Sequence, residues 1–83
     1  MKLLFENRFG DYRVVAEVAN REEAATAIAD FLKAHEFKSY YTRNWISEYE
    51  TFFRLNYDVG SHTEFFVIDF PTHEAAEKFL KGE

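Results

Sequence analysis

Three aromatic doublets lie in three consecutive segments that have the pattern of β-strands: Tyr40-Tyr41, Phe52-Phe53 and Phe65-Phe66. Successive side chains of a strand point to opposite faces of a sheet, so each doublet places one ring on each face. Helices of the same chain can cover one of these faces. A chain of 83 residues has little left to cover the other. The doublets therefore indicate a sheet with one buried face and one aromatic face that is available for contact.

The alternation of apolar and polar residues predicts five strands. We expect them at residues 2–9, 12–18, 38–46, 53–59 and 64–70. In the second strand, alternation places Tyr12, Val14, Ala16 and Val18 on one face. Short turns separate most of the strands, which is typical of antiparallel hairpins.

Two segments have the pattern of helices. Asn20 and Glu23 form a capping-box pair at the start of the first, and apolar residues follow at helical spacing as far as His35. Thr72 is the expected N-cap of the second, which runs to Leu80. Each helix has a single apolar stripe, so each is expected to pack against one surface.

The order of elements, β-β-α-β-β-β-α, predicts an α+β fold. We expect one domain over residues 1–83, with an antiparallel sheet of four to five strands and both helices on one face. The chain contains ten Phe, five Tyr and one Trp, and large rings are an efficient way to build a small core. The predicted core residues are Ile28, Phe31, Phe53, Leu55, Ile68 and Phe79.

Composition excludes several classes of protein. Residues 44–83 contain three basic and eight acidic side chains, which account for the net charge of −5 and argue against nucleic-acid binding. There is no cysteine, so disulfides and cysteine-based zinc sites are excluded. The first residues are too short an apolar run for a signal peptide, and no stretch approaches the ~20 apolar residues of a membrane span. We expect a cytoplasmic protein that does not contact a membrane.

Tyr41, Arg43 and Trp45 alternate along the predicted strand 38–46 and therefore share one face. Rings beside an arginine can stack a base and pair a phosphate, and they are also the residues that protein interfaces favour. The simpler interpretation is a well-packed strand with one solvated arginine. Strand parity adds Phe52 and Phe65 to the same face. These five residues are the predicted partner-binding or ligand-binding site.

Asp58, Ser61 and His62 lie around one turn and could be imagined as a hydrolytic site. Catalytic triads are defined by geometry, however, and a productive hydrogen bond between the adjacent Ser61 and His62 is awkward. Asp, Gly and Ser are also ordinary turn residues, so a structural turn is the preferred interpretation. No segment has the spacing of a metal site or of a glycine-rich phosphate loop. We therefore expect no catalytic residue, cofactor or metal.

Three passages carry a resemblance to a group of known proteins. They are MKLLFEN at residues 1–7, HEFKSYYTR at residues 35–43 with Trp45, and DVGSHTEFF at residues 58–66. Together they look like small proteins encoded in phages and prophages of Gram-positive bacteria. Such proteins have no assigned catalytic residues to carry over. The resemblance implies a context, since small acidic phage proteins often bind and block a host factor, including host defence enzymes.

The sequence thus predicts a non-enzymatic binding protein, a phage-type accessory protein or inhibitor that binds a host protein through its aromatic sheet face. A homodimer through the same face is a further expectation. The alternative is a protein that binds or sequesters a nucleotide-like small molecule. A hydrolase that uses His62 and Asp58 is the third possibility.

Overall fold

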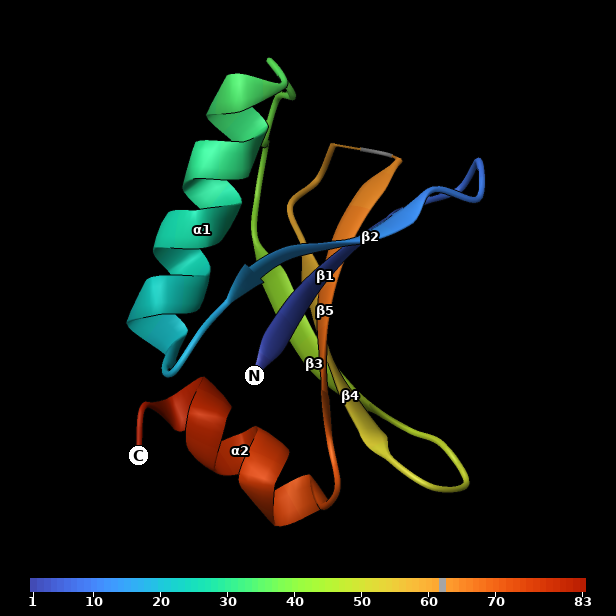
Figure 1. The fold of residues 1–83 in the computed structure, drawn as a ribbon, viewed down its shortest axis with the longest axis vertical. Coiled ribbons are helices and arrows are strands. Elements are labelled where there is room, and N and C mark those ends of the chain that lie inside the picture. Colours follow the sequence, from blue (N-terminus) through green and yellow to red (C-terminus); the bar gives the residue numbers. More distant parts are fainter. Residues whose placement is uncertain (62) are drawn as a thin grey trace.

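The computed structural model describes residues 1–61 and 63–83, which form five strands and two helices in the predicted order (Figure 1). The elements are β1 (Lys2–Asn7), β2 (Tyr12–Glu17), α1 (Arg21–Ala34), β3 (Arg43–Glu48), β4 (Phe53–Asp58), β5 (Glu64–Phe70) and α2 (His73–Lys81). The predicted α+β class and element order are confirmed.

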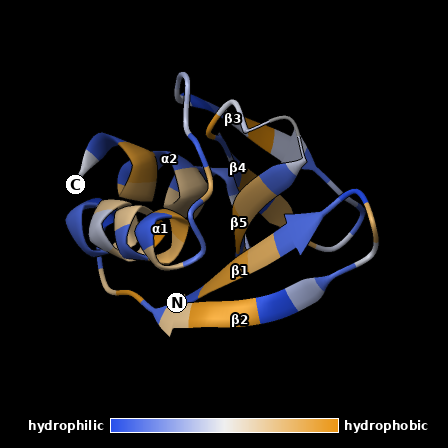
Figure 2. Cartoon of the chain, turned by 90° about the horizontal axis from the view of Figure 1, so that it is seen from above, coloured by the Kyte–Doolittle hydropathy of each residue, from blue (hydrophilic) through white to orange (hydrophobic). Residues whose placement is uncertain are grey.

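The five strands form one sheet in the order β2-β1-β5-β4-β3, and every neighbouring pair is antiparallel. The central strand, β5, joins two hairpins that are formed by the first two strands and by β3 and β4. The edges of the sheet are therefore β2 and β3. Both helices lie on one side of this sheet, as Figure 2 shows from above.

Short-range hydrogen bonds fix where the helices begin. The Asn20 side chain accepts the amide of Glu23 at 2.9 Å, and the Glu23 carboxylate accepts the amide of Ala19 at 3.0 Å. The Thr72 hydroxyl accepts the amide of Ala75 at 3.1 Å. These are the caps that the sequence predicts, because Asn and Thr side chains satisfy amides that the first helical turn leaves unpaired.

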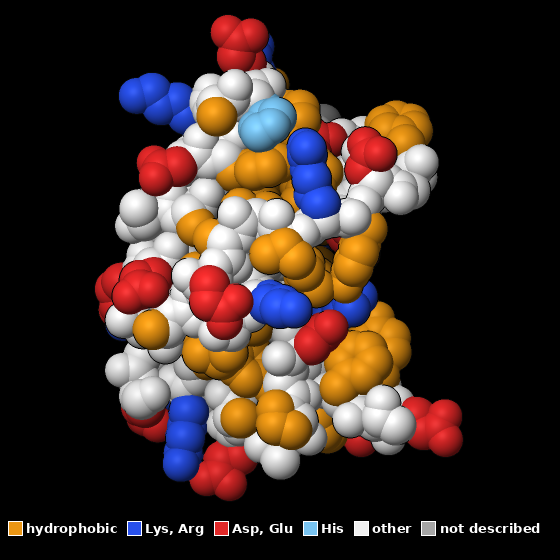
Figure 3. All heavy atoms as spheres, in the orientation of Figure 1, with side chains coloured by type: hydrophobic (Ala, Val, Ile, Leu, Met, Phe, Trp, Pro, Cys, Tyr) orange, Lys and Arg blue, Asp and Glu red, His pale blue; other side chains and the backbone are white. Residues whose placement is uncertain are grey.

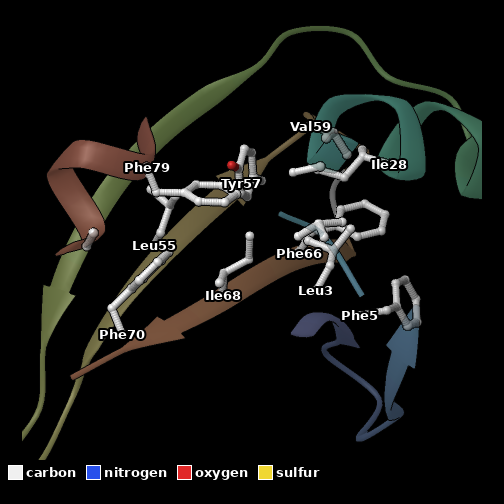
Figure 4. Packing of buried hydrophobic residues seen from close by; sticks show 13 residues of the cluster. Leu3, Phe5, Ile28, Leu55, Tyr57, Val59, Phe66, Ile68, Phe70 and Phe79 are labelled. Atoms are coloured by element: carbon white, nitrogen blue, oxygen red, sulfur yellow. The ribbon is translucent and has the colours of Figure 1, made fainter. Parts of the chain in front are cut away.

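The core lies between the helices and the inner face of the sheet. The largest fully buried side chains of this cluster are Phe5, Phe66, Leu3, Leu55 and Ile68, all on strands. Four of the six predicted core residues, Ile28, Leu55, Ile68 and Phe79, are buried. Figure 4 shows these side chains packed together between the two helices and the strands.

Phe31 and Phe53 are half-buried, which corrects their assignment to the buried core. The ring of Phe31 contacts the core rings of Phe5 and Phe66 at the edge of the cluster. Phe53 begins β4 and meets the ring of His73 at the start of α2. Both side chains lie where the helical cover ends, which helical spacing and strand parity cannot reveal.

The prediction that Val14 and Ala16 share one face of β2 is wrong. The register of β1 and β2 shifts between Leu3, which pairs with Ala16, and Leu4, which pairs with Val14. This irregularity inserts Val15, as a β-bulge does. Beyond it, Ala16 packs against the core, while Val14 is 54% exposed on the opposite side of the sheet. One extra residue thus divides the strand between two faces.

The strand predicted at residues 38–46 begins at Arg43 and continues to Glu48. The preceding segment cannot pair further, because β4 ends at Asp58 and the chain turns at Gly60, where φ is 71°. A backbone hydrogen bond from the amide of Tyr40 to the carbonyl of Val59 holds the segment there. Tyr41 therefore precedes the strand instead of lying in it.

Candidate functional site: the open face of the sheet

The sheet face opposite the helices, here called the open face, collects the predicted binding residues. Its rows follow from the strand register. A row here is a line of paired residues that runs across neighbouring strands. The first row consists of Glu6, Phe65, Asp58 and Arg43. The next two rows consist of Leu4, Val67, Asn56 and Trp45, and of Asp69, Arg54 and Ser47. Figure 3 shows hydrophobic side chains interleaved with charged ones on the side of the molecule away from α1.

The first feature of this face is a group of four residues, the Arg43 cluster, which consists of Tyr41, Arg43, Trp45 and Asp58. The guanidinium carbon of Arg43 lies 5.6 Å from the ring centre of Tyr41 and 5.6 Å from that of Trp45. Both distances are within the range of cation–π attraction. Tyr41 and Trp45 are 49% and 42% exposed, so both rings reach the surface.

Asp58 fixes the Arg43 cluster from beneath. Its carboxylate accepts a hydrogen bond from Arg43 at 2.8 Å and from the backbone amide of Gly60 at 2.9 Å. The Tyr41 hydroxyl lies at 3.5 Å. The hydrogen bond from Arg43, and after it that from Gly60, holds the pKa of Asp58 below its usual value. The buried carboxylate therefore stays charged and keeps Arg43 between the two rings.

A second group, the Arg54 cluster, consists of Tyr49, Phe52, Arg54, Asp69 and Glu6. The rings of Tyr49 and Phe52 stack at 4.7 Å, with 9° between their planes. The guanidinium carbon of Arg54 lies 5.5 Å and 5.4 Å from the two ring centres. A backbone hydrogen bond of 2.9 Å from Tyr49 to Phe52 closes the β3–β4 turn and brings the rings together.

Arg54 is held by carboxylates of two other strands. Asp69 of β5 accepts Nε at 2.8 Å and Nη2 at 3.1 Å, a bidentate arrangement, and Glu6 of β1 lies 4.0 Å from Nη1. The side chain of Arg54 is only 17% exposed. The hydrogen bonds to Asp69 raise the pKa of Arg54. A planar guanidinium in a bidentate pair has a defined orientation, so this cluster is rigid.

The structure thus divides the five predicted site residues. Tyr41, Arg43 and Trp45 lie together, Phe52 belongs to the other cluster, and Phe65 lies on the central strand, half-buried. That they bind a partner stays a prediction. Tyr49, Arg54 and Asp69 are not among the predicted site residues. Arg54 could have been found, because it alternates with Phe52 and Asp58.

Two side chains of the imagined hydrolytic turn have structural roles. Asp58 is engaged by Arg43 and Gly60. The Ser61 hydroxyl accepts the amide of Glu64 and donates to its carbonyl, both at 3.2 Å. His62 lies outside the described residues. Within the described ranges no three His, Asp or Glu side chains gather as a possible metal site.

Neither of the two described helices is long and apolar enough to cross a membrane. The chain was also compared with protein-family models, with curated proteins and with solved structures, and none of these matched.

Proposed function

We propose that this chain is a non-enzymatic binding protein that captures another protein through the open face. One observation carries the proposal. Tyr41, Trp45 and Tyr49 are each more than 40% exposed, while the arginines beside them are already paired with carboxylates of the same chain. Tyr, Trp and Arg are the residue types that supply most of the binding energy in protein interfaces.

The rings are held in place before a partner arrives. Arg43 is fixed by Asp58, and Arg54 is fixed by Asp69. Each arginine in turn contacts two aromatic rings. Ordering a long side chain on binding costs about 0.5–1.5 kcal/mol, so side chains that are already ordered favour tight association. The two clusters are in this sense preorganised.

The charge of the face favours a protein over a polynucleotide. Among its described residues, the carboxylates of Glu6, Asp58 and Asp69 face the guanidinium groups of Arg43 and Arg54. A phosphate would have to compete with these carboxylates for the arginines. An apolar or aromatic surface with basic residues at its rim has no such conflict, and it would match the acidic second half of the chain.

The resemblance to small phage and prophage proteins supplies the context of the proposal. In that context the partner is a host protein, for example one of a defence system, and binding through the open face inhibits it. The alternative, sequestration of a nucleotide-like molecule by Tyr41, Arg43 and Trp45, has less support. The phosphate of such a nucleotide would meet the carboxylate of Asp58. The two described cavities lie at α1, on the helical side of the sheet, and neither is lined by Tyr41, Arg43 or Trp45.

The proposal is tested by affinity capture from a bacterial lysate, with the captured protein identified by mass spectrometry and then purified. We expect Trp45→Glu or Tyr49→Glu to weaken its binding about 30-fold or more, the effect of losing a hot spot worth ~2 kcal/mol. Thr26→Glu introduces the same charge at an exposed position of α1 and should bind like the wild type. Binding that is equal in all four proteins would contradict the proposal.

A further inference from the structure

A cavity of about 650 Å³ lies on the helical side of the sheet, away from the open face. Its walls come from α1, α2, β3, β4 and the segment that leads into β3. The aliphatic part of the lining is formed by Ala25, Ile28, Ala29, Leu32, Val59 and Leu80. Its volume is within the range of ~300–1,000 Å³ that is typical of small-molecule sites in proteins.

Tyr57 of β4 lines this cavity and is only 8% exposed. Its hydroxyl is buried and has no hydrogen-bond partner among the described residues. Figure 4 shows Tyr57 in the row between Phe79 of α2 and Ile28 of α1. A buried hydroxyl without a partner is unfavourable, typically by about 1–3 kcal/mol, so such groups usually meet a partner that completes them.

The chemistry of the Tyr57 hydroxyl limits what that partner can be. Like any tyrosine hydroxyl the group is protonated at neutral pH, and burial raises its pKa further, to about 12. A protonated hydroxyl donates a hydrogen bond. A ligand acceptor such as a carbonyl oxygen would satisfy this donor.

The residues at the mouth of the cavity favour a ligand without net charge. Arg21 and Glu22, both in the lining, form an ion pair of 3.2 Å, and Arg21 also donates to the carbonyl of Leu80 at 3.3 Å. The opposite charges of Arg21 and Glu22 cancel, and the carbonyl of Leu80 is neutral. Thr42 and Asn44, on the opposite wall, are polar but neutral. An isolated charge in the apolar part would have no counter-ion there, which is costly.

We infer that this cavity binds an uncharged, largely apolar small molecule that accepts a hydrogen bond from the hydroxyl of Tyr57. The inference does not depend on the proposed function, because the cavity and the open face lie on opposite sides of the sheet. Ligand binding here would join α1, α2 and β4 around one molecule.

The neutral naphthalene ketone prodan is a suitable probe, because it has an apolar body, one carbonyl acceptor and an emission colour that reports polarity. We expect the protein to shift prodan emission to the blue in a saturable way. Tyr57→Phe keeps the ring and removes only the hydroxyl, so it should weaken binding about fivefold, the effect of one hydrogen bond. Because it removes an unpaired group, this variant should remain folded.

Ala29→Phe places a ring at the mouth of the cavity and should abolish saturable binding. Ala34→Phe is the matched control, an exposed position of the same helix that is not in the lining, and it should bind prodan like the wild type. No saturable binding by the wild type, or equal binding by both alanine variants, would overturn the cavity as a ligand site. Binding that Ala29→Phe abolishes and Tyr57→Phe leaves unchanged would overturn the role of the hydroxyl.

Discussion

Asp58 connects three parts of the open face through a single carboxylate. It pairs with Arg43 of β3, accepts the amide of Gly60 in the following turn, and lies near the hydroxyl of Tyr41. The group is buried, whereas the side chain of Arg43 is 65% exposed. The charge of the buried Asp58 carboxylate therefore determines where the exposed Arg43 side chain lies.

The lowered pKa of Asp58 predicts a dependence of stability on acid. A carboxyl whose pKa is lower in the folded state stabilises the fold above its unfolded pKa of ~3.9, and this contribution is lost as the pH falls through the folded pKa. We expect Asp58→Asn to lower the free energy of unfolding at neutral pH and to show a shallower decline toward ~pH 3. Urea unfolding at both pH values measures this. Asp30→Asn controls for the loss of an exposed carboxylate, and identical slopes in Asp58→Asn and the wild type would contradict the prediction.

Tyr57 predicts the opposite dependence, on alkali. Its pKa is raised to about 12, above the ~10 of an unfolded tyrosine, because burial disfavours the ionised form. This group therefore leaves stability independent of pH below ~pH 10 and lowers it as the pH rises toward 12. We expect wild-type protein to lose more stability than Tyr57→Phe over that interval. Urea unfolding at ~pH 9 and ~pH 11 compares the two proteins. Parallel curves would show that the hydroxyl is not buried.

Among the elements, the turn after β4 decides where Tyr41 lies. Gly60 has a φ of 71°, and a Cβ atom built there would be 2.7 Å from the Tyr41 ring. Gly10 also has a positive φ, of 96°, but apart from its chain neighbours no atom of the described residues lies within 4 Å of the position that a Cβ would take there. Substitution of either glycine would therefore strain the backbone. Only at Gly60 would the added side chain also contact Tyr41.

Substitution of these two glycines separates strain from contact. Gly10→Ala should cost about 1–2 kcal/mol for the left-handed backbone alone. Gly60→Ala should cost about 1–3 kcal/mol more, because the added methyl group overlaps the Tyr41 ring, and it should displace that ring from Arg43. Thermal unfolding gives the stabilities, and the NMR shifts of the Trp45 indole report the cluster. Equal losses in the two variants would mean that Tyr41 does not pack on Gly60.

The packing of α1 against the sheet gives a fourth prediction. Phe31 lies 4.8 Å from the ring of Phe5 but is half-buried. We expect Phe31→Ala to lower the free energy of unfolding by about 2–3 kcal/mol, less than the ~3–5 kcal/mol of a fully buried phenylalanine. Phe9→Ala, at a ring that is 77% exposed, should change it by less than about 0.5 kcal/mol. Similar thermal melts for the two variants would remove Phe31 from the core.

For the whole molecule, the uncovered sheet face predicts self-association when no partner is present. Two copies can cover the rings of Trp45, Tyr49 and Phe52 with the same surface, as an isologous dimer does. We expect sedimentation equilibrium at micromolar concentration to show a reversible dimer, and Phe52→Glu to shift it to monomer without unfolding. Thr26→Glu should dimerise like the wild type. Monomeric wild-type protein at every concentration would contradict the dimer and leave the face to another protein.

Local patterns determined the elements of this protein and their order. The caps at Asn20 and Thr72, and the alternation of residues 53–59, act over a few residues, so the sequence alone predicted the helices, the strands and the α+β class. Strand parity also predicted that Arg43 and Trp45 share a face, because alternation within one strand does not depend on its neighbours.

Only the tertiary structure decided which distant residues meet. Pairing of Arg43 with Asp58 depends on the register between β3 and β4, and that of Arg54 with Asp69 depends on the register between β4 and β5. The bulge at Val15 arises where β1 and β2 pair. The cavity beside Tyr57 depends on how two helices dock on the sheet. These features follow from contacts across the chain, and no local period in the sequence records such contacts.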